Sequence, residues 1–100
     1  MNNIQTLPYD HDTIARQIYD WLKMRRNKRD IDTYEAIQKA TGFSLADQGN
    51  NTLTEKDCIE IHYKLMALIK KENEYVADFS AYEDMCVGLP YNIPFVFRKK

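Results

Sequence analysis

The chain has little glycine, proline or cysteine and almost no net charge. Three glycines, three prolines and two cysteines occur in 100 residues. There is accordingly no glycine-rich loop of the kind that holds nucleotide phosphates, no low-complexity segment and no set of disulfides. Fourteen basic and fifteen acidic residues give a formal net charge of −1. A balanced charge produces no global field that would draw the chain to nucleic acid or to a membrane.

Signals for export and for membrane insertion are also missing. The first ten residues, MNNIQTLPYD, contain neither a charged start nor an apolar stretch, so we expect no signal peptide. The longest aliphatic run, residues 65–69, is far shorter than the roughly 20 residues that span a bilayer. Two cysteines without an export signal are typical of a reducing compartment. These features predict a cytoplasmic protein with free thiols and no membrane partner.

The most apolar stretch, residues 54–72, predicts a long helix. Its apolar residues recur at intervals of three and four, which places them on one helical face: Cys58, Ile61, Leu65, Leu68 and Ile69. Thr54 is a suitable N-cap, and Asp57 stands where the acid of a capping box belongs. Because so wide an apolar face needs partners on more than one side, we expect this helix at the centre of the core.

Two shorter helices are predicted before it. The first begins after Asp10 or Asp12 and runs to about Asn27, and the second runs from Asp32 to Gly42. The expected buried faces are Ile14, Ile18, Trp21 and Leu22 on the first helix, and Ala36, Ile37 and Ala40 on the second. Residues 1–9 carry little pattern and are expected to form a loose arm, which leaves residues 10–100 as a single globular domain.

The sequence of the last third of the chain is compatible with more than one secondary structure. Residues 74–86 fit both a helical period and the alternation of a strand, and we favour a helix. Residues 85–89 and 93–97 are short β-prone runs separated by a turn, which predicts a β-hairpin or an edge strand. The predicted fold class is α+β and mainly α. It has a three- to four-helix core around the long central helix and a short C-terminal hairpin.

This order of elements matches that of a winged helix-turn-helix, a fold often used to bind DNA. The match is one of architecture and does not determine function. A helix-turn-helix joins its helices by about three or four residues, whereas here residues 43–53 intervene. A recognition helix also reads bases from its N-terminal turns. In this chain those turns carry Glu55, Asp57 and Glu60, which would repel phosphates.

Two basic segments nevertheless make DNA binding the alternative function. The residues concerned are Lys23, Arg25, Arg26, Lys28 and Arg29 after the first helix, and Arg98, Lys99 and Lys100 at the end of the chain. Cationic side chains of this kind bind phosphates. Short charge runs are more often ordinary solvated surface, and we favour that interpretation here.

No metal site or bound cofactor is predicted. Cys58 and His62 lie one helical turn apart, but His11 and Cys86 have no spacing that would bring them to the same place. Residues 46–57 faintly resemble a calcium-binding EF-hand loop. The first position is Ala46, which has no ligand oxygen, and the sixth is Asn51, where glycine is needed. A buried cysteine beside a histidine, and an ordinary connecting loop, explain these residues better.

No catalytic arrangement is evident, and we predict that the protein is not an enzyme. The chain has no GxSxG sequence and no cysteine–histidine pair with a third orienting group. Two acid pairs, Asp10 with Asp12 and Asp30 with Asp32, stand at helix starts, where acids serve as caps.

The leading hypothesis is a binding module whose partner is another protein or a second copy of the chain. Twelve aromatic residues, seven of them tyrosine, favour a contact surface. We expect the partner to meet exposed aromatic side chains near the C-terminus, chiefly Tyr82, Tyr91 and Phe95.

Overall fold

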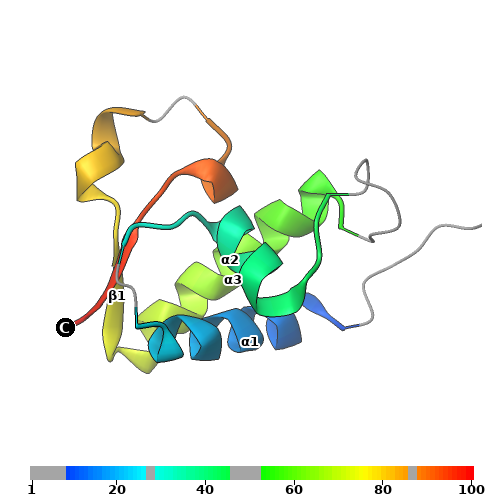
Figure 1. Ribbon diagram of the computed structural model, residues 1–100, viewed down its shortest axis with the longest axis horizontal. Coiled ribbons are helices and arrows are strands. Elements are labelled where there is room, and N and C mark those ends of the chain that lie inside the picture. The colour runs from blue at the N-terminus through cyan, green and yellow to red at the C-terminus, as the bar shows by residue number, and fades with distance from the viewer. Residues whose placement is uncertain (1–8, 27–28, 46–52, 86–87) are drawn as a thin grey trace, which may run out of the picture.

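The computed structural model describes residues 9–26, 29–45, 53–85 and 88–100 and is drawn in Figure 1. Three α-helices are followed by two strands and two short 3-10 segments. In chain order these are α1 (His11–Met24), α2 (Thr33–Thr41), α3 (Glu55–Glu72), β1 (Tyr75–Asp78), η2 (Ser80–Met85), η3 (Pro90–Asn92) and β2 (Val96–Lys99). The predicted α+β class, mainly α, is confirmed, and the two strands form one antiparallel pair.

Side-chain caps determine where the helices begin. Asp10 accepts a hydrogen bond from the Thr13 backbone N–H at 2.8 Å and starts α1. Asp32 accepts from the Glu35 backbone N–H at 2.7 Å and starts α2. Thr54 and Asp57 form the predicted capping box at the start of α3. Each cap satisfies N–H groups that have no partner within the helix.

The ends of the helices follow from backbone conformation. Gly42 ends α2 with a φ of 84°, a left-handed conformation that glycine adopts without a steric penalty. Asn73 ends α3 in the same way, with a φ of 60°. Helix α1 stops at Met24, earlier than the predicted end near Asn27, because Arg25 is extended with a ψ of 136°. Arg25, Arg26 and Arg29 therefore lie outside the helix, in the segment that connects it to α2.

Helix α3 lies at the centre of the core, as predicted. Cys58, Ile61, Leu65 and Ile69 are buried, whereas Leu68 is only partly buried. In Figure 1, α1 runs beside α3, and α2 crosses over them. A hydrogen bond of 2.8 Å between Thr33 Oγ1 and His62 Nδ1 joins the first turn of α2 to the middle of α3. Both of these polar side chains are buried, so the bond satisfies groups that water does not reach.

The sheet does not form between the two segments that the sequence indicated. Strand β1 pairs antiparallel with β2, with Tyr75 opposite Lys99 and Asp78 opposite Val96. The preferred helix over residues 74–86 is therefore wrong for residues 75–78, and residues 80–85 form a 3-10 segment. Residues 86–87, inside the expected first hairpin strand, lie outside the described residues, and residues 88–89 are not in a strand.

Aromatic packing explains why residues 75–78 form a strand. The left-handed Asn73 turns the chain out of α3. The Tyr75 ring then stacks on the Phe97 ring across the sheet, with centroids 4.7 Å apart. Both rings also pack against the Tyr19 ring in a T-shaped geometry, with interplanar angles of 87° and 88°. Cross-strand aromatic pairs of this kind stabilise a short sheet, and they depend on a partner 22 residues away along the chain.

One more backbone pair joins the sheet to the helices. Ile31 and Phe95 exchange two hydrogen bonds of 2.9 Å, which places the segment before α2 alongside the chain that enters β2. Both side chains are buried. No helix among the described residues is long and apolar enough to cross a bilayer.

The buried position of Leu65 generates a stability prediction. Leu65→Ala should lower the free energy of unfolding by about 2–5 kcal/mol, because it removes core contacts and leaves a cavity. Leu68→Ala on the same helix is the matched control and should cost clearly less, since Leu68 is only partly buried. Denaturant titration measures both values. Equal losses for the two variants would mean that the inward face of α3 is wrongly assigned.

A second prediction concerns pH. Burial lowers the pKa of the His62 imidazole below its usual value of 6.5, so the unfolded chain binds a proton more readily than the folded one. Stability should therefore decline as pH falls below about 6.5 and should not depend on His62 above it. In His62→Gln the decline between neutral pH and about pH 5 should be smaller. Urea titrations at several pH values test this, and an unchanged pH slope in the variant would contradict it.

Candidate functional site

The region where the chain leaves α1 and enters α2 forms a cleft of about 270 Å³. Trp21 stands on the last full turn of α1, and Arg25 and Arg26 follow the helix end. The chain returns at Arg29, held near the sheet by the adjoining Ile31–Phe95 backbone pair, and then enters α2. The side chains that line this basic cleft are Trp21, Arg25, Arg26, Arg29, Ile31, Glu35 and Lys39.

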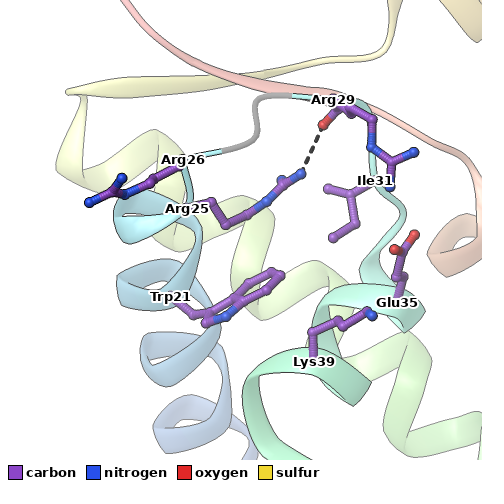
Figure 2. Close-up of a pocket in the computed structure, with 7 residues that line it drawn as sticks. All are labelled: Trp21, Arg25, Arg26, Arg29, Ile31, Glu35 and Lys39. Carbon is purple, nitrogen blue, oxygen red and sulfur yellow. Dashed lines mark hydrogen bonds between the residues drawn. The ribbon is translucent and has the colours of Figure 1, made fainter.

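Figure 2 shows how these side chains are directed. Arg25 reaches across the cleft, and its Nη2 donates a hydrogen bond to the Arg29 carbonyl oxygen at 3.1 Å. The central carbon of the Arg25 guanidinium lies 5.5 Å from the centroid of the Trp21 ring, a cation–π distance. Lys39, on α2, points toward Glu35, the Arg29 guanidinium is directed away from Arg25, and Arg26 points to the other side of α1. Arg25 is therefore the central cation of the cleft.

The electrostatic character of the basic cleft is positive. Four cationic side chains and one carboxylate, that of Glu35, line it. Burial lowers the pKa of Arg25, the carboxylate of Glu35 raises it, and the positive charge of Arg29 lowers it further. The ion pairs found within the described part of the chain do not include Arg25, Arg26 or Lys39. An anion that entered would relieve the mutual repulsion of these cations.

The first predicted basic segment is thus brought together only in part. Arg25, Arg26 and Arg29 line the cleft, but Lys23 lies 3.8 Å from Asp20 and over the Tyr19 ring. Lys28 lies outside the described residues. Lys23 is therefore a residue of the α1 surface and not of the cleft.

Two cleft residues were missed or misassigned from the sequence. Lys39 belongs to another helix, and only the packing of α1 against α2 brings it to the arginines. Trp21 was expected in the buried face of α1, but it is only partly buried and lines the basic cleft instead. Trp21 follows the buried Ile18 by three residues and precedes Arg25, the C-cap of α1, by four. This spacing is compatible with the edge of the apolar face as well as with its centre.

The second basic segment belongs to the sheet. Arg98 pairs with Asp78 at 3.2 Å across the two strands. Lys100 donates from Nζ to the Asn73 side chain and from its backbone N–H to the Glu74 carbonyl at 3.0 Å. Lys99 is exposed. None of these three residues lines the basic cleft.

The residues expected to meet a protein partner are mostly in the core. Tyr91 and Phe95 are 2% and 0% exposed, so the expectation that they form an open contact surface is wrong. Tyr91 packs edge-on against Tyr34, and Phe95 packs against Phe79. Phe95 turns inward because its backbone pairs with Ile31 and not within a terminal hairpin. Tyr82 is partly buried, and its hydroxyl donates to Asp30.

The remaining candidate sites have structural roles. His11 contacts Asp57 at 2.9 Å, and His62 bonds to Thr33. Burial raises the pKa of the Cys58 thiol to about 12, which opposes the thiolate that a metal requires. The described residues contain no group of three or more histidines, cysteines or acids positioned to hold a metal ion. Cys86 and the loop 46–52 lie outside the described residues.

In each of the two acid pairs, one residue caps a helix and the other makes a different contact. Asp10 and Asp32 act as the predicted caps of α1 and α2. Asp12 instead lies 3.2 Å from the Lys64 ammonium, and Asp30 accepts from Tyr82. The expectation that all four acids are caps is correct for one member of each pair.

No protein-family model, no curated protein and no solved structure matches this chain. The geometry of the described residues is therefore the basis for the functional argument.

The environment of Cys58 predicts an inert thiol. Under native conditions Cys58 should react with a thiol reagent far more slowly than in denaturant, because it is fully buried and its pKa is raised. Cys58→Ala should therefore leave the native labelling rate unchanged and remove one reactive thiol after unfolding. Native labelling that drops in this variant, or one zinc per chain that is lost with Cys58, would contradict the assignment.

Proposed function

We propose that this protein is a non-enzymatic binding module that holds nucleic acid by its phosphate backbone at the basic cleft. The observation that carries the proposal is that Arg25, Arg29 and Lys39, from two sides of the chain, all contribute to the lining of one cleft beside Trp21. Guanidinium groups bind phosphate oxygens through two parallel hydrogen bonds, which an ammonium group does not provide.

The ligand class follows from charge and shape. A net charge of −1 gives no general attraction to polyanions, so binding depends on this local group of cations. A phosphate-bearing chain suits several cations arranged along one cleft better than a single carboxylate does. An acidic protein segment is the competing ligand, and the test below distinguishes it.

Binding in the manner of a winged helix-turn-helix is the less favoured form of this proposal. The order of α1, α2, α3 and a two-stranded sheet agrees with that fold. Its recognition helix would be α3, whose first turn carries Glu55 and Asp57. These acids would face DNA phosphates of the same sign. The basic cleft lies between α1 and α2 instead, so we place the ligand there.

A protein partner at Tyr82, Tyr91 and Phe95 is the weaker proposal. Two of the three side chains are already used in the core. A hot spot in an interface needs aromatic side chains that become buried only on binding. Tyr82 alone keeps exposed surface, and its hydroxyl already contacts Asp30.

The test is the salt dependence of binding to labelled single-stranded and duplex DNA of mixed sequence, followed by fluorescence anisotropy. The logarithm of the association constant should fall linearly with the logarithm of salt concentration. Each lost phosphate contact should reduce the slope by about 0.7 for single strands and about 0.9 for duplex. Arg25→Ala/Lys39→Ala should weaken binding. It should also make the association constant less dependent on salt concentration, because phosphate contacts are lost.

The matched control is Lys70→Ala/Lys71→Ala, which removes the same charge from the exposed end of α3. It should bind like the parent protein. Thermal melts confirm that both double variants remain folded. Absence of binding to any nucleic acid at low salt, or equal losses in the two double variants, would rule out the proposal. Salt-sensitive binding of an acidic peptide, with no binding of either DNA, would show that the cleft takes an acidic protein segment instead.

A further inference from the structure

Trp21 is placed differently from Tyr19, the other large aromatic residue near it on α1. It is the single tryptophan of the chain. Tyr19, two positions earlier on α1, is completely buried, whereas Trp21 keeps part of its surface exposed in the basic cleft. The indole lies between α1 and the residues that approach from α2, as Figure 2 shows. A partly exposed indole surrounded by cations has the two components of a nucleotide site, a stacking surface and phosphate ligands.

We infer that the basic cleft takes an unpaired nucleotide, so that the protein prefers single-stranded nucleic acid to duplex. The base stacks on the exposed surface of the Trp21–Arg25 pair, and the flanking phosphates contact Arg29 and Lys39. This inference rests on the proposed function and names its ligand.

The shape of the cleft supports a single strand. Its volume of about 270 Å³ is near the lower limit of pockets for small ligands, roughly 300–1,000 Å³. A space of this size accepts a group as large as one nucleotide, but it does not accept the width of a double helix. Duplex DNA is read by a convex element, an α-helix or a β-ribbon, that enters its groove. A concave site between two helices has the opposite shape.

The arrangement of Arg25 supports stacking. Its guanidinium lies over the Trp21 ring at 5.5 Å and is held from the far side by the Arg29 carbonyl at 3.1 Å. Aromatic rings and guanidinium planes are both surfaces on which unpaired bases stack. Because Arg25 is already ordered by two contacts, less conformational freedom is lost when a base arrives.

Some of the acidic residues lie away from the cleft, whereas Asp20 adjoins Trp21 on α1 and Asp30 and Asp32 flank the lining residue Ile31. The acidic side chains at the start of α3, Glu55 and Asp57, are on a different helix from the cleft-lining residues, and Asp10 and Asp12 stand at the opposite end of α1 from Trp21. Only Glu35 contributes a carboxylate to the lining.

The experiment uses the intrinsic fluorescence of Trp21, which reports on the cleft directly because no other tryptophan contributes. The full chain is titrated with single-stranded DNA of mixed sequence, with a hairpin duplex of the same number of phosphates, and with inorganic polyphosphate. Single-stranded DNA should quench the fluorescence and bind at least about 5-fold more tightly than the duplex. Polyphosphate should compete for the cations but cause little quenching, because it has no bases.

Two variants at Trp21 distinguish the loss of base stacking from a loss of folding. Trp21→Leu should weaken binding of single-stranded DNA by about 5- to 150-fold, the effect of losing one stacked base, while the salt slope stays unchanged because no phosphate contact is lost. Trp21→Phe keeps an aromatic face and should restore most of the affinity. Anisotropy with labelled DNA measures both variants, and melts establish that they fold.

The outcomes distinguish this inference from the proposed function. Equal affinity for duplex and single strand, without quenching, would overturn the inference and leave phosphate binding intact. Failure of every nucleic acid to bind would remove both. If Trp21→Phe bound single-stranded DNA as weakly as Trp21→Leu, with both variants folded, the stacking role would be overturned, since an aromatic ring at that position would then have no effect on affinity.

Discussion

The backbone pair between Ile31 and Phe95 determines much of this structure. Its two hydrogen bonds of 2.9 Å connect residues 64 positions apart along the chain. They place the segment before α2 against the sheet, and they turn Phe95 into the core. The same pair holds the chain near Arg29, whose carbonyl oxygen accepts the hydrogen bond from Arg25. One long-range contact therefore supports the core and also positions one wall of the basic cleft.

The basic cleft shows how a chain with balanced charge can present a local positive surface. Most cations of α1 and of β2 are close to acids: Arg16 lies near Asp20 and Glu72, and Arg98 near Asp78. Exposed pairs of this kind contribute little to stability. Their effect is to cancel charge locally. The lining of the basic cleft, by contrast, has four cationic residues and one carboxylate, that of Glu35.

Part of the fold follows from local chemistry and could be predicted. The N-caps Asp10, Asp32 and Thr54 act on N–H groups within three residues, and Gly42 ends its helix by its own backbone freedom. Leu65 is buried because the spacing of apolar residues already defines the inward face of α3. The basic cleft was predictable only to the extent that Arg25, Arg26 and Arg29 are neighbours in sequence.

The sequence alone determined the three helices, their caps and the central place of α3, since these depend on contacts within a few residues. Tertiary structure decided the rest. Residues 75–78 form a strand because Tyr75 finds Phe97, and Phe95 is buried because it finds Ile31. Lys39 joins the arginines because α2 packs against α1. In each case the deciding partner is distant along the chain, and local periodicity carries no information about a partner that only folding brings near.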